Sequence, residues 1–261
     1  MGKISLSRSA LKNIAIISML IDHVGALIIY NLYLVACYVD GEFLLGDLMP
    51  TKAKILYAIY FVMRCIGRIA FPIFCYMVVE GFLHTHSRPK YLLRLVIFAL
   101  ISEIPFDMDF GSGMIDFSCQ NVIWLYVIAV LMMWVIERFG ETQKSTEKRV
   151  VVTVIAIVVA GLLAYTCDYS FGGILLIASM YLFRDKKTYY WLGCIVSLIV
   201  IALISSWTEL FAIVALLLLE LYNGEKGKGS KYLFYIFYPA HLTLLGMASG
   251  VIYVLFEYGM I

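Results

Sequence analysis

The chain has 261 residues, of which 63% are hydrophobic and 15% charged, with a formal net charge of +2. A soluble domain usually carries about a quarter charged residues, so this composition excludes an ordinary soluble protein. Apolar runs of about 18 residues or more recur, and each can cross a bilayer as a helix. Because the runs are unbroken rather than alternating, the sequence predicts an all-α, polytopic integral membrane bundle. We expect membrane lipids to surround it, and we expect no nucleic-acid partner.

About nine spans are predicted within a single domain over residues 1–261. They lie near residues 12–36, 55–82, 91–106, 120–138, 150–167, 171–183, 190–206, 208–222 and 232–256. The basic start followed by an apolar run is also typical of a signal peptide. However, the first run is longer than a usual signal core and contains Asp22 and His23, so we expect it to be retained. The glycine-rich and charged connector NGEKGKGSK at 223–231 indicates a flexible loop rather than a domain boundary.

The loops predict the orientation of the chain. Basic segments precede the first span and follow the second, fourth, sixth and eighth, whereas the alternate loops carry acidic residues. Lys52 and Lys54 are the exception. Since positive loops stay in the cytoplasm, we expect a cytoplasmic N-terminus, an external C-terminus and a multi-pass protein of the bacterial cytoplasmic membrane.

Several charged side chains lie at membrane depth. Asp22 and His23 are about ten residues into the first span, and Arg64 and Arg68 lie near the middle of the second, in RCIGRIAFPIF. Each Arg or Asp near the centre of a spanning helix costs roughly 2.5–3.5 kcal/mol unless it is paired or hydrated. Pro72 frees the backbone carbonyl of Arg68 and can kink the helix beside a cavity.

The two arginines need an anionic or hydrated environment, because a spacing of four residues places them on one helix face. Asp22 is one partner, but a single carboxylate does not balance two guanidinium groups. The pair therefore indicates a site for an additional anion, such as a phosphate or carboxylate. The alternative is a structural ion-pair network in which Asp22 and either Glu80 or Glu103 neutralise the arginines.

Two histidines lie within predicted spans. An imidazole titrates near neutral pH, so His23 is the natural proton-transfer group, although a lone histidine in an apolar span is often structural. Its position near Asp22 and the arginines favours a functional role. His241, in FYPAHL, either faces the same cavity or acts as a hydrogen-bond donor in helix packing. Glu80 and Asp168 are further cavity candidates.

The segment HTHSRPK follows the second span. His84 and His86 are two residues apart, but no third ligand is near them in the sequence, so we expect no metal site. The segment instead contributes to a basic cytoplasmic rim, which contacts anionic lipids or binds the phosphates of a nucleotide-type donor. The predicted rim consists of Lys12, His84, Arg88, Lys90 and Arg94.

Six motifs follow one another in order: LKNIAIISMLIDHVGALI, RCIGRIAFPIFCYMVVEGFLHT, KYLLRLVIFALISEIPFD, QNV, DYSFGGILLI and FYPAHL. Together they resemble the TraX family, named after conjugative-plasmid proteins that acetylate the N-terminus of pilin. That family is similar to the wider transmembrane acyltransferases, which use a histidine in the first helix and an arginine motif followed by a proline. His23, Arg64, Arg68 and Pro72 match this pattern. The chain departs from it at Cys65, where the wider group often has another arginine, and in the spacing to the proline.

The resemblance implies an acyltransferase that transfers acetyl from acetyl-CoA, entering from the cytoplasm, to an amine or hydroxyl. The acceptor is left open as a pilin-like peptide, a glycan or a small molecule. In this interpretation His23 is the general base, Arg64 or Arg68 stabilises the oxyanion, and Asp22 completes the predicted catalytic group. Two alternatives remain, a transporter that clamps an organic anion between the paired arginines and a helical scaffold without chemistry.

Overall fold

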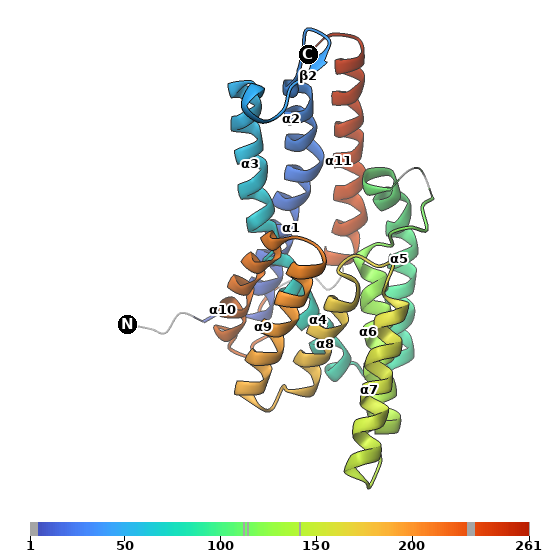
Figure 1. The fold of residues 1–261 in the computed structure, drawn as a ribbon. Coiled ribbons are helices and arrows are strands. Elements are labelled where there is room, and N and C mark those ends of the chain that lie inside the picture. Colours follow the sequence, from blue (N-terminus) through green and yellow to red (C-terminus); the bar gives the residue numbers. More distant parts are fainter. Residues whose placement is uncertain (1–4, 112, 114, 141, 229–232, 261) are drawn as a thin grey trace.

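The protein is an all-α helical bundle. A computed structural model describes residues 5–111, 113, 115–140, 142–228 and 233–260, and its helices run up and down the bundle (Figure 1). The described strands are the two short strands of a hairpin, β1 (Tyr38–Val39) and β2 (Glu42–Phe43). The predicted fold class is therefore confirmed. Residues 229–231 of the predicted flexible connector lie outside the described residues.

The helices fall close to the predicted spans. In chain order they are α1 (Arg8–Val24), η1 (Gly25–Ile29), α2 (Tyr30–Cys37), η2 (Gly46–Leu48), α3 (Thr51–Gly67), α4 (Ala70–His84), α5 (Arg88–Phe110), α6 (Val122–Val135), η3 (Ile136–Gly140), α7 (Thr146–Leu163), α8 (Ser170–Leu182), α9 (Lys187–Ile204), η4 (Trp207–Ala212), α10 (Ile213–Glu220) and α11 (Leu233–Glu257). The η1 and η3 segments are π-helical turns that continue α1 and α6 without a break.

Several helical segments can cross a membrane. Among the described residues, five are long and apolar enough by length and composition: Arg8–Cys37, Thr51–His84, Val122–Gly140, Lys187–Ile204 and Tyr235–Glu257. The chain is thus a multi-pass membrane protein. The exact number of spans and the side of the N-terminus stay predictions. The span expected at 208–222 is wrong as a single helix, because this segment forms the 3₁₀ helix η4 and the eight-residue α10, too short to cross a bilayer.

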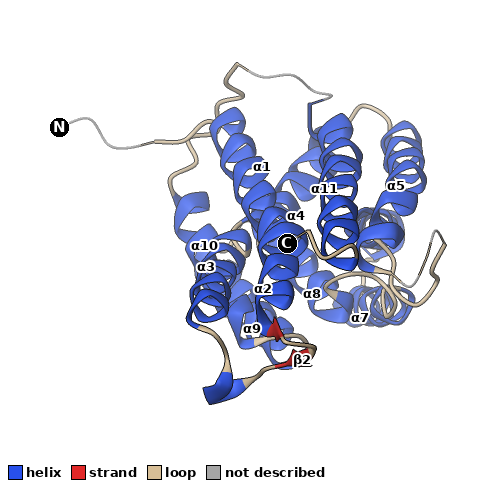
Figure 2. Cartoon of the chain, turned by 90° about the horizontal axis from the view of Figure 1, so that it is seen from above, coloured by secondary structure: helices blue, strands red, loops and turns tan. Residues whose placement is uncertain are grey.

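Long and short helices together create two levels in the bundle. In the upper part of Figure 1, α2, α3 and α11 rise beyond the ends of α8 and α9. Seen from above, α4 lies near the centre of the bundle (Figure 2). The connectors that end the shorter helices therefore lie half-way along the longer ones, beside residues in the middle of the continuous Arg8–Cys37 rod and of the α3–α4 segment.

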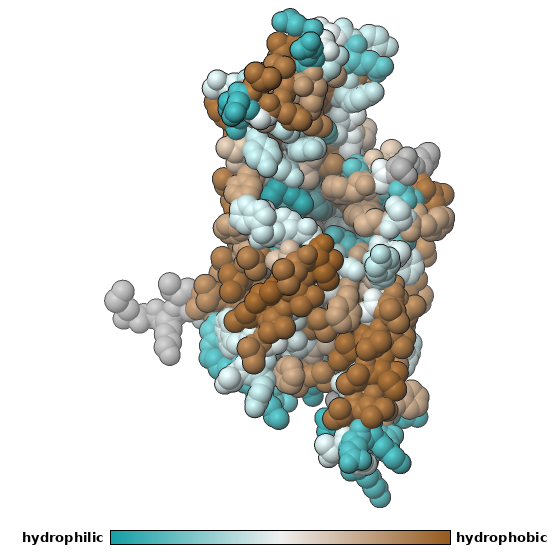
Figure 3. Space-filling view, viewed as in Figure 1, coloured by the Kyte–Doolittle hydropathy of each residue, from teal (hydrophilic) through white to brown (hydrophobic). Residues whose placement is uncertain are grey.

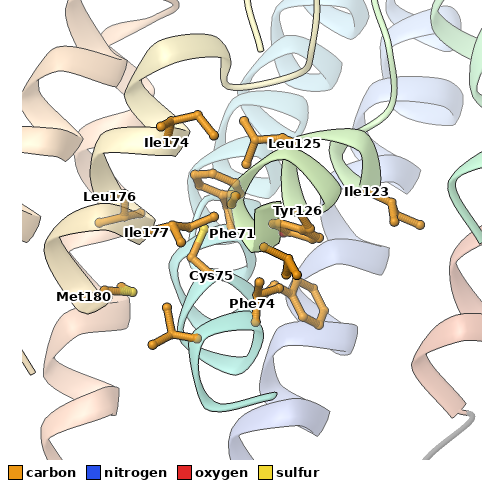
Figure 4. Packing of buried hydrophobic residues seen from close by; sticks show 14 of the residues in the cluster. Phe71, Phe74, Cys75, Ile123, Leu125, Tyr126, Ile174, Leu176, Ile177 and Met180 are labelled. Atoms are coloured by element: carbon orange, nitrogen blue, oxygen red, sulfur yellow. The ribbon is translucent and has the colours of Figure 1, made fainter. Parts of the chain in front are cut away.

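The core below this level is formed by α4, α6 and α8. Figure 4 shows Phe71, Tyr126 and Ile174 from these helices pointing toward one another. Small residues bring the helices close together, since a Cβ added at Gly172 would lie 2.4 Å from Ile201 Cγ1. Because lipid is as apolar as the core, such close packing rather than exclusion from water holds membrane helices together.

The helix is interrupted one turn before Pro72. Helix α3 ends at Gly67 and α4 begins at Ala70, so Arg68 lies at the break between them. Proline has no N–H to donate to the Arg68 carbonyl, and the turn tightens there. The Ser18 hydroxyl of α1 donates to the carbonyls of Ile66 (2.6 Å) and Gly67 (3.3 Å), and so satisfies backbone groups at the break.

Candidate functional site

A polar pocket lies at the level of the α3–α4 break. It has a volume of about 220 Å³. Its lining comes from α1, the α3–α4 break, α5, α6, α11 and the connectors before α6 and α8. At this level Figure 3 shows hydrophilic residues on the floor of a hollow between apolar flanks. The described residues of the pocket include His23, Arg64, Arg68, Asp168 and Tyr169.

A network of ion pairs forms one wall of the pocket. Asp22 accepts from Arg64 through Oδ2 (2.5 Å) and from Arg68 through Oδ1 (2.6 Å). Arg68 also donates to Glu209 of η4 at 2.5 Å. We call Asp22, Arg64, Arg68 and Glu209 the central cluster. Its two arginines and two carboxylates are formally balanced, so the expectation that a single carboxylate faces two guanidinium groups is corrected by Glu209.

The two arginines of the central cluster differ in their free donors. Arg68 is buried, and its Nε, Nη1 and Nη2 donate to the Arg64 carbonyl, Glu209 and Asp22. Arg64 uses only Nη1, toward Asp22, among the described residues, and its side chain is 26% exposed. Both line the pocket. Arg64 is therefore the arginine with N–H groups left for a ligand, and Arg68 is held in place by its neighbours.

His23 and His241 lie against each other. His23 Nδ1 is 2.6 Å from His241 Nε2, and His241 Nδ1 is 2.7 Å from the Phe237 carbonyl oxygen. The rings of Phe110 and Tyr238 pack around His23, with centroids 5.7 Å and 6.4 Å away. The structure thus brings His241, which the sequence left between cavity and packing, into direct contact with the predicted base.

The connector between α7 and α8 closes another side of the pocket. Tyr169 and Ser170 adopt positive φ angles of 63° and 46°, which non-glycine residues adopt only at a cost. Tyr169 stacks on Phe71 with ring planes 2° apart, and this contact holds the turn. Asp168 precedes it and lines the pocket. Burial raises the pKa of the Asp168 carboxyl to about 6, although the positive charge of Arg68 opposes this shift.

Glu80 and Glu103 do not join the central cluster. Glu80 accepts from Arg8 at 2.5 Å and lines a separate cavity of about 470 Å³ between α4, α9 and α10. Glu103 accepts from the side chains of Asn121 and Trp124. The predicted roles of Glu80 and Glu103 as partners of the two pocket arginines are therefore wrong: Glu80 lies twelve residues beyond Arg68, about 18 Å along the helix axis, and Glu103 accepts from residues at the start of α6.

The predicted rim lies away from the pocket, which none of its five residues lines. Arg88 is bound to Glu137 at 2.8 Å and lies over the Phe82 ring, so its charge is already satisfied. Arg94 lies 5.8 Å from the centroid of the Tyr91 ring. Lys90 and His84 are exposed, and Lys12 is half-buried on α1. In the described part of the chain there is no group of three or more His, Cys, Asp or Glu side chains that could hold a metal ion.

Sequence reasoning missed two pocket-level residues, Glu209 and Tyr169. Glu209 is an acidic residue inside a predicted span, so the cost argument that singled out Asp22 would also have found it. Tyr169 lies in the DYSFGG motif, but nothing in the motif indicates a left-handed backbone at a tyrosine. In the structure this conformation occurs together with the stacking of Tyr169 on Phe71, a contact between α4 and the connector that the motif alone does not show.

The comparisons with known proteins support the family resemblance of the six sequence motifs. The profile of the family described as TraX protein matches residues 7–249. The chain belongs to the TraX family. A curated relative is the "Probable fimbrial assembly protein FimC, serogroup H1" of Dichelobacter nodosus. It is 28% identical over an alignment of 273 positions, gaps included, which covers 94% of this chain and 97% of that protein. No solved structure matches this TraX chain.

Proposed function

We propose that this TraX protein is a membrane-embedded acyltransferase that transfers acetyl from acetyl-CoA to an amine or hydroxyl. The observation that carries the proposal is that a base and a cation meet in one small pocket. His23 and Arg64 both line it, and Arg64 keeps N–H donors that no described side chain occupies. Acyl transfer needs a group that takes the acceptor's proton and a donor for the oxyanion.

The proposed reaction uses these groups in order. His23 removes a proton as the acceptor nitrogen or oxygen attacks the thioester carbonyl. The carbonyl oxygen becomes negative and is stabilised by Arg64, which Asp22 holds in place at 2.5 Å. The C–S bond then breaks, and the proton passes from His23 to the leaving sulfur. The products are the acetylated acceptor and free CoA thiol, and a base in this role contributes typically about 10²–10⁴-fold.

The pocket size supports entry of the acyl end of the donor alone. Binding pockets for drug-sized ligands measure about 300–1,000 Å³, and this one has about 220 Å³. The nucleotide end would remain at the membrane surface. Lys12 is eleven residues before His23 on the same helical rod, about 16 Å along its axis. A flexible pantetheine arm spans such a distance, so Lys12 and Arg94 are the proposed phosphate contacts.

The acceptor and the membrane are part of the same proposal. The printed name of the Dichelobacter relative connects that protein with fimbrial assembly. This favours a pilin-like peptide amine over a glycan or a small molecule as the acceptor. We place the protein in the bacterial cytoplasmic membrane with its N-terminus in the cytoplasm, because the basic loops follow the positive-inside pattern.

The test is thioester consumption by the purified protein in lipid nanodiscs. Acetyl-CoA is added with a peptide that has a free N-terminal amine, and released thiol and acetylated peptide are both measured. We expect transfer by the wild type and its loss in His23→Ala. His86→Ala removes an exposed histidine outside the pocket and serves as the matched control.

The outcomes separate the alternatives. Binding of acetyl-CoA without thiol release, together with uptake of an organic anion into vesicles, would support the transporter and overturn the acyltransferase. The balanced charge of the central cluster weighs against that alternative, which rested on an uncompensated pair of arginines. Equal transfer by wild type and His23→Ala would also overturn the proposed mechanism.

A further inference from the structure

The hydrogen bond between His23 and His241 is an edge-to-edge contact. The ring planes differ by 3°, yet the centroids lie 4.8 Å apart while the two nitrogens are only 2.6 Å apart. The nitrogen edges therefore face each other within nearly one plane, as an N–H···N hydrogen bond requires. Each such bond needs one donor and one acceptor, so the proton position on one ring determines that on the other.

The backbone of α11 decides which nitrogen of His241 carries the proton. The Phe237 carbonyl oxygen, 2.7 Å from His241 Nδ1, can only accept, so Nδ1 must donate. In a neutral imidazole the other nitrogen, Nε2, is then an acceptor. An additional proton on the pair would put a positive charge on His241, which is 4% exposed, and burial disfavours the charged form of a histidine.

The same constraint passes to His23. Because His241 Nε2 accepts, His23 Nδ1 must donate, and His23 Nε2 is left with its lone pair. Since Nδ1 is occupied by His241, Nε2 is the nitrogen that His23 can offer to the pocket it lines. Free histidine in water favours the opposite form, with the proton on Nε2, so the protein environment reverses the ordinary preference.

We propose that His241 is a positioning residue that holds His23 as the Nδ1–H tautomer and so presents an unprotonated Nε2 to the acceptor. This inference rests on the proposed function for its catalytic consequence, but the tautomer itself can be tested without any reaction. His241 suits the role because it is 4% exposed and its ring stacks on Phe237 with planes 11° apart, so water does not compete for its nitrogens. A partner on the second nitrogen fixes ring orientation and basicity in metal-bound histidines by the same means.

The direct test is ¹⁵N NMR of protein labelled at histidine in lipid nanodiscs. The chain has only four histidines, so the His23 signals are assigned by their loss in His23→Ala. We expect wild-type His23 with its proton on Nδ1 and a non-protonated Nε2. In His241→Phe, which keeps a flat ring without an acceptor, we expect His23 to shift toward the Nε2–H form.

His241→Gln is the conservative variant, because its amide oxygen reaches the position of the lost Nε2 and can accept from His23. We expect this variant to keep the Nδ1–H tautomer, provided that its melting temperature shows a folded protein. His86→Ala is the control that should leave the His23 signals unchanged. A wild-type His23 protonated on Nε2, or an unchanged tautomer in a folded His241→Phe protein, would overturn the proposal.

The activity readout follows the same series. We expect His241→Phe to lower kcat for acetyl transfer by about 10–100-fold with an unchanged KM for acetyl-CoA, and His241→Gln to recover most of the loss. A loss that Gln does not recover would mean that His241 acts through packing and would overturn the positioning role. A wild type without transfer would overturn the proposed function, whereas the NMR result decides the tautomer on its own.

Discussion

The central cluster and the ion pairs near the helix ends use similar residue types in different surroundings. In the central cluster the Arg68, Asp22 and Glu209 side chains are 6%, 10% and 4% exposed. The other group, which we call the edge pairs, consists of Arg8–Glu80, Arg88–Glu137 and Lys187–Glu220. Edge pairs have water within reach, and both members of Lys187–Glu220 are largely exposed.

The difference shows that the effect of an ion pair on the free energy of unfolding depends on its burial. An exposed pair gains little, because water and salt replace each partner when the other is removed. In a buried pair, loss of one partner leaves a charge that cannot be solvated. Three charged residues of the central cluster, Asp22, Arg64 and Arg68, also line the pocket beside His23, so there the same contacts affect both stability and chemistry.

The largest effect is expected for Asp22→Asn. This substitution removes the carboxylate shared by Arg64 and Arg68 and leaves Glu209 alone to compensate the buried Arg68 and the partly buried Arg64. We expect a loss of about 3–5 kcal/mol in the free energy of unfolding. Denaturant unfolding in detergent, followed by tryptophan fluorescence, measures it. A loss no larger than that of Glu137→Gln, an edge-pair variant, would contradict the distinction between the two groups.

Arg64→Lys is expected to affect activity more than stability. Lysine keeps the charge beside Asp22 but loses the fork of N–H donors, so the oxyanion loses a partner. We expect kcat for acetyl transfer to fall by about 10²–10³-fold, as for loss of one oxyanion donor. Arg68→Lys is the matched variant and should lower the melting temperature more, because Arg68 donates through three nitrogens. The reverse ranking would show that the roles of the two arginines are exchanged.

Gly67→Ala tests how closely α1 approaches the helix break. A Cβ at this position would lie 2.0 Å from Asp22 Oδ1, so the carboxylate must move away from the arginines. We expect a loss of about 1–3 kcal/mol in the free energy of unfolding, as in other overpacked sites. Gly250→Ala on α11 is the control, because nothing lies within 4 Å of its added Cβ. Similar stability of both variants would mean that α1 can shift freely here.

The smallest effect is expected for Glu137→Gln in the edge pairs. The Glu137 side chain is 36% exposed, and Arg88 keeps its contact with the Phe82 ring. We expect a change of less than about 1 kcal/mol in the free energy of unfolding, decreasing further as salt is raised. Thermal unfolding at two salt concentrations checks this. A large, salt-independent loss would place this pair with the central cluster instead.

Much of the architecture was predictable because its signals are local. Apolar runs of spanning length indicated a multi-pass helical protein, and Pro72 indicated the break at Arg68. The segment 208–222 misled the prediction because hydropathy measures how apolar a segment is, not whether it is one continuous helix. Ser206 caps the 3₁₀ segment before α10 by accepting from the Thr208 N–H, and this segment places Glu209 beside Arg68.

The sequence by itself determined the membrane class, the TraX membership and the shared depth of Asp22, His23, Arg64 and Arg68. These follow from composition, from motif order and from the cost of charge in lipid, which each residue carries wherever its neighbours lie. Only the tertiary structure decided the partners: Glu209 for Arg68, His241 for His23, and Arg8 for Glu80. Partner choice depends on which helices are adjacent and how each is rotated about its axis, and hydropathy along one chain does not encode either.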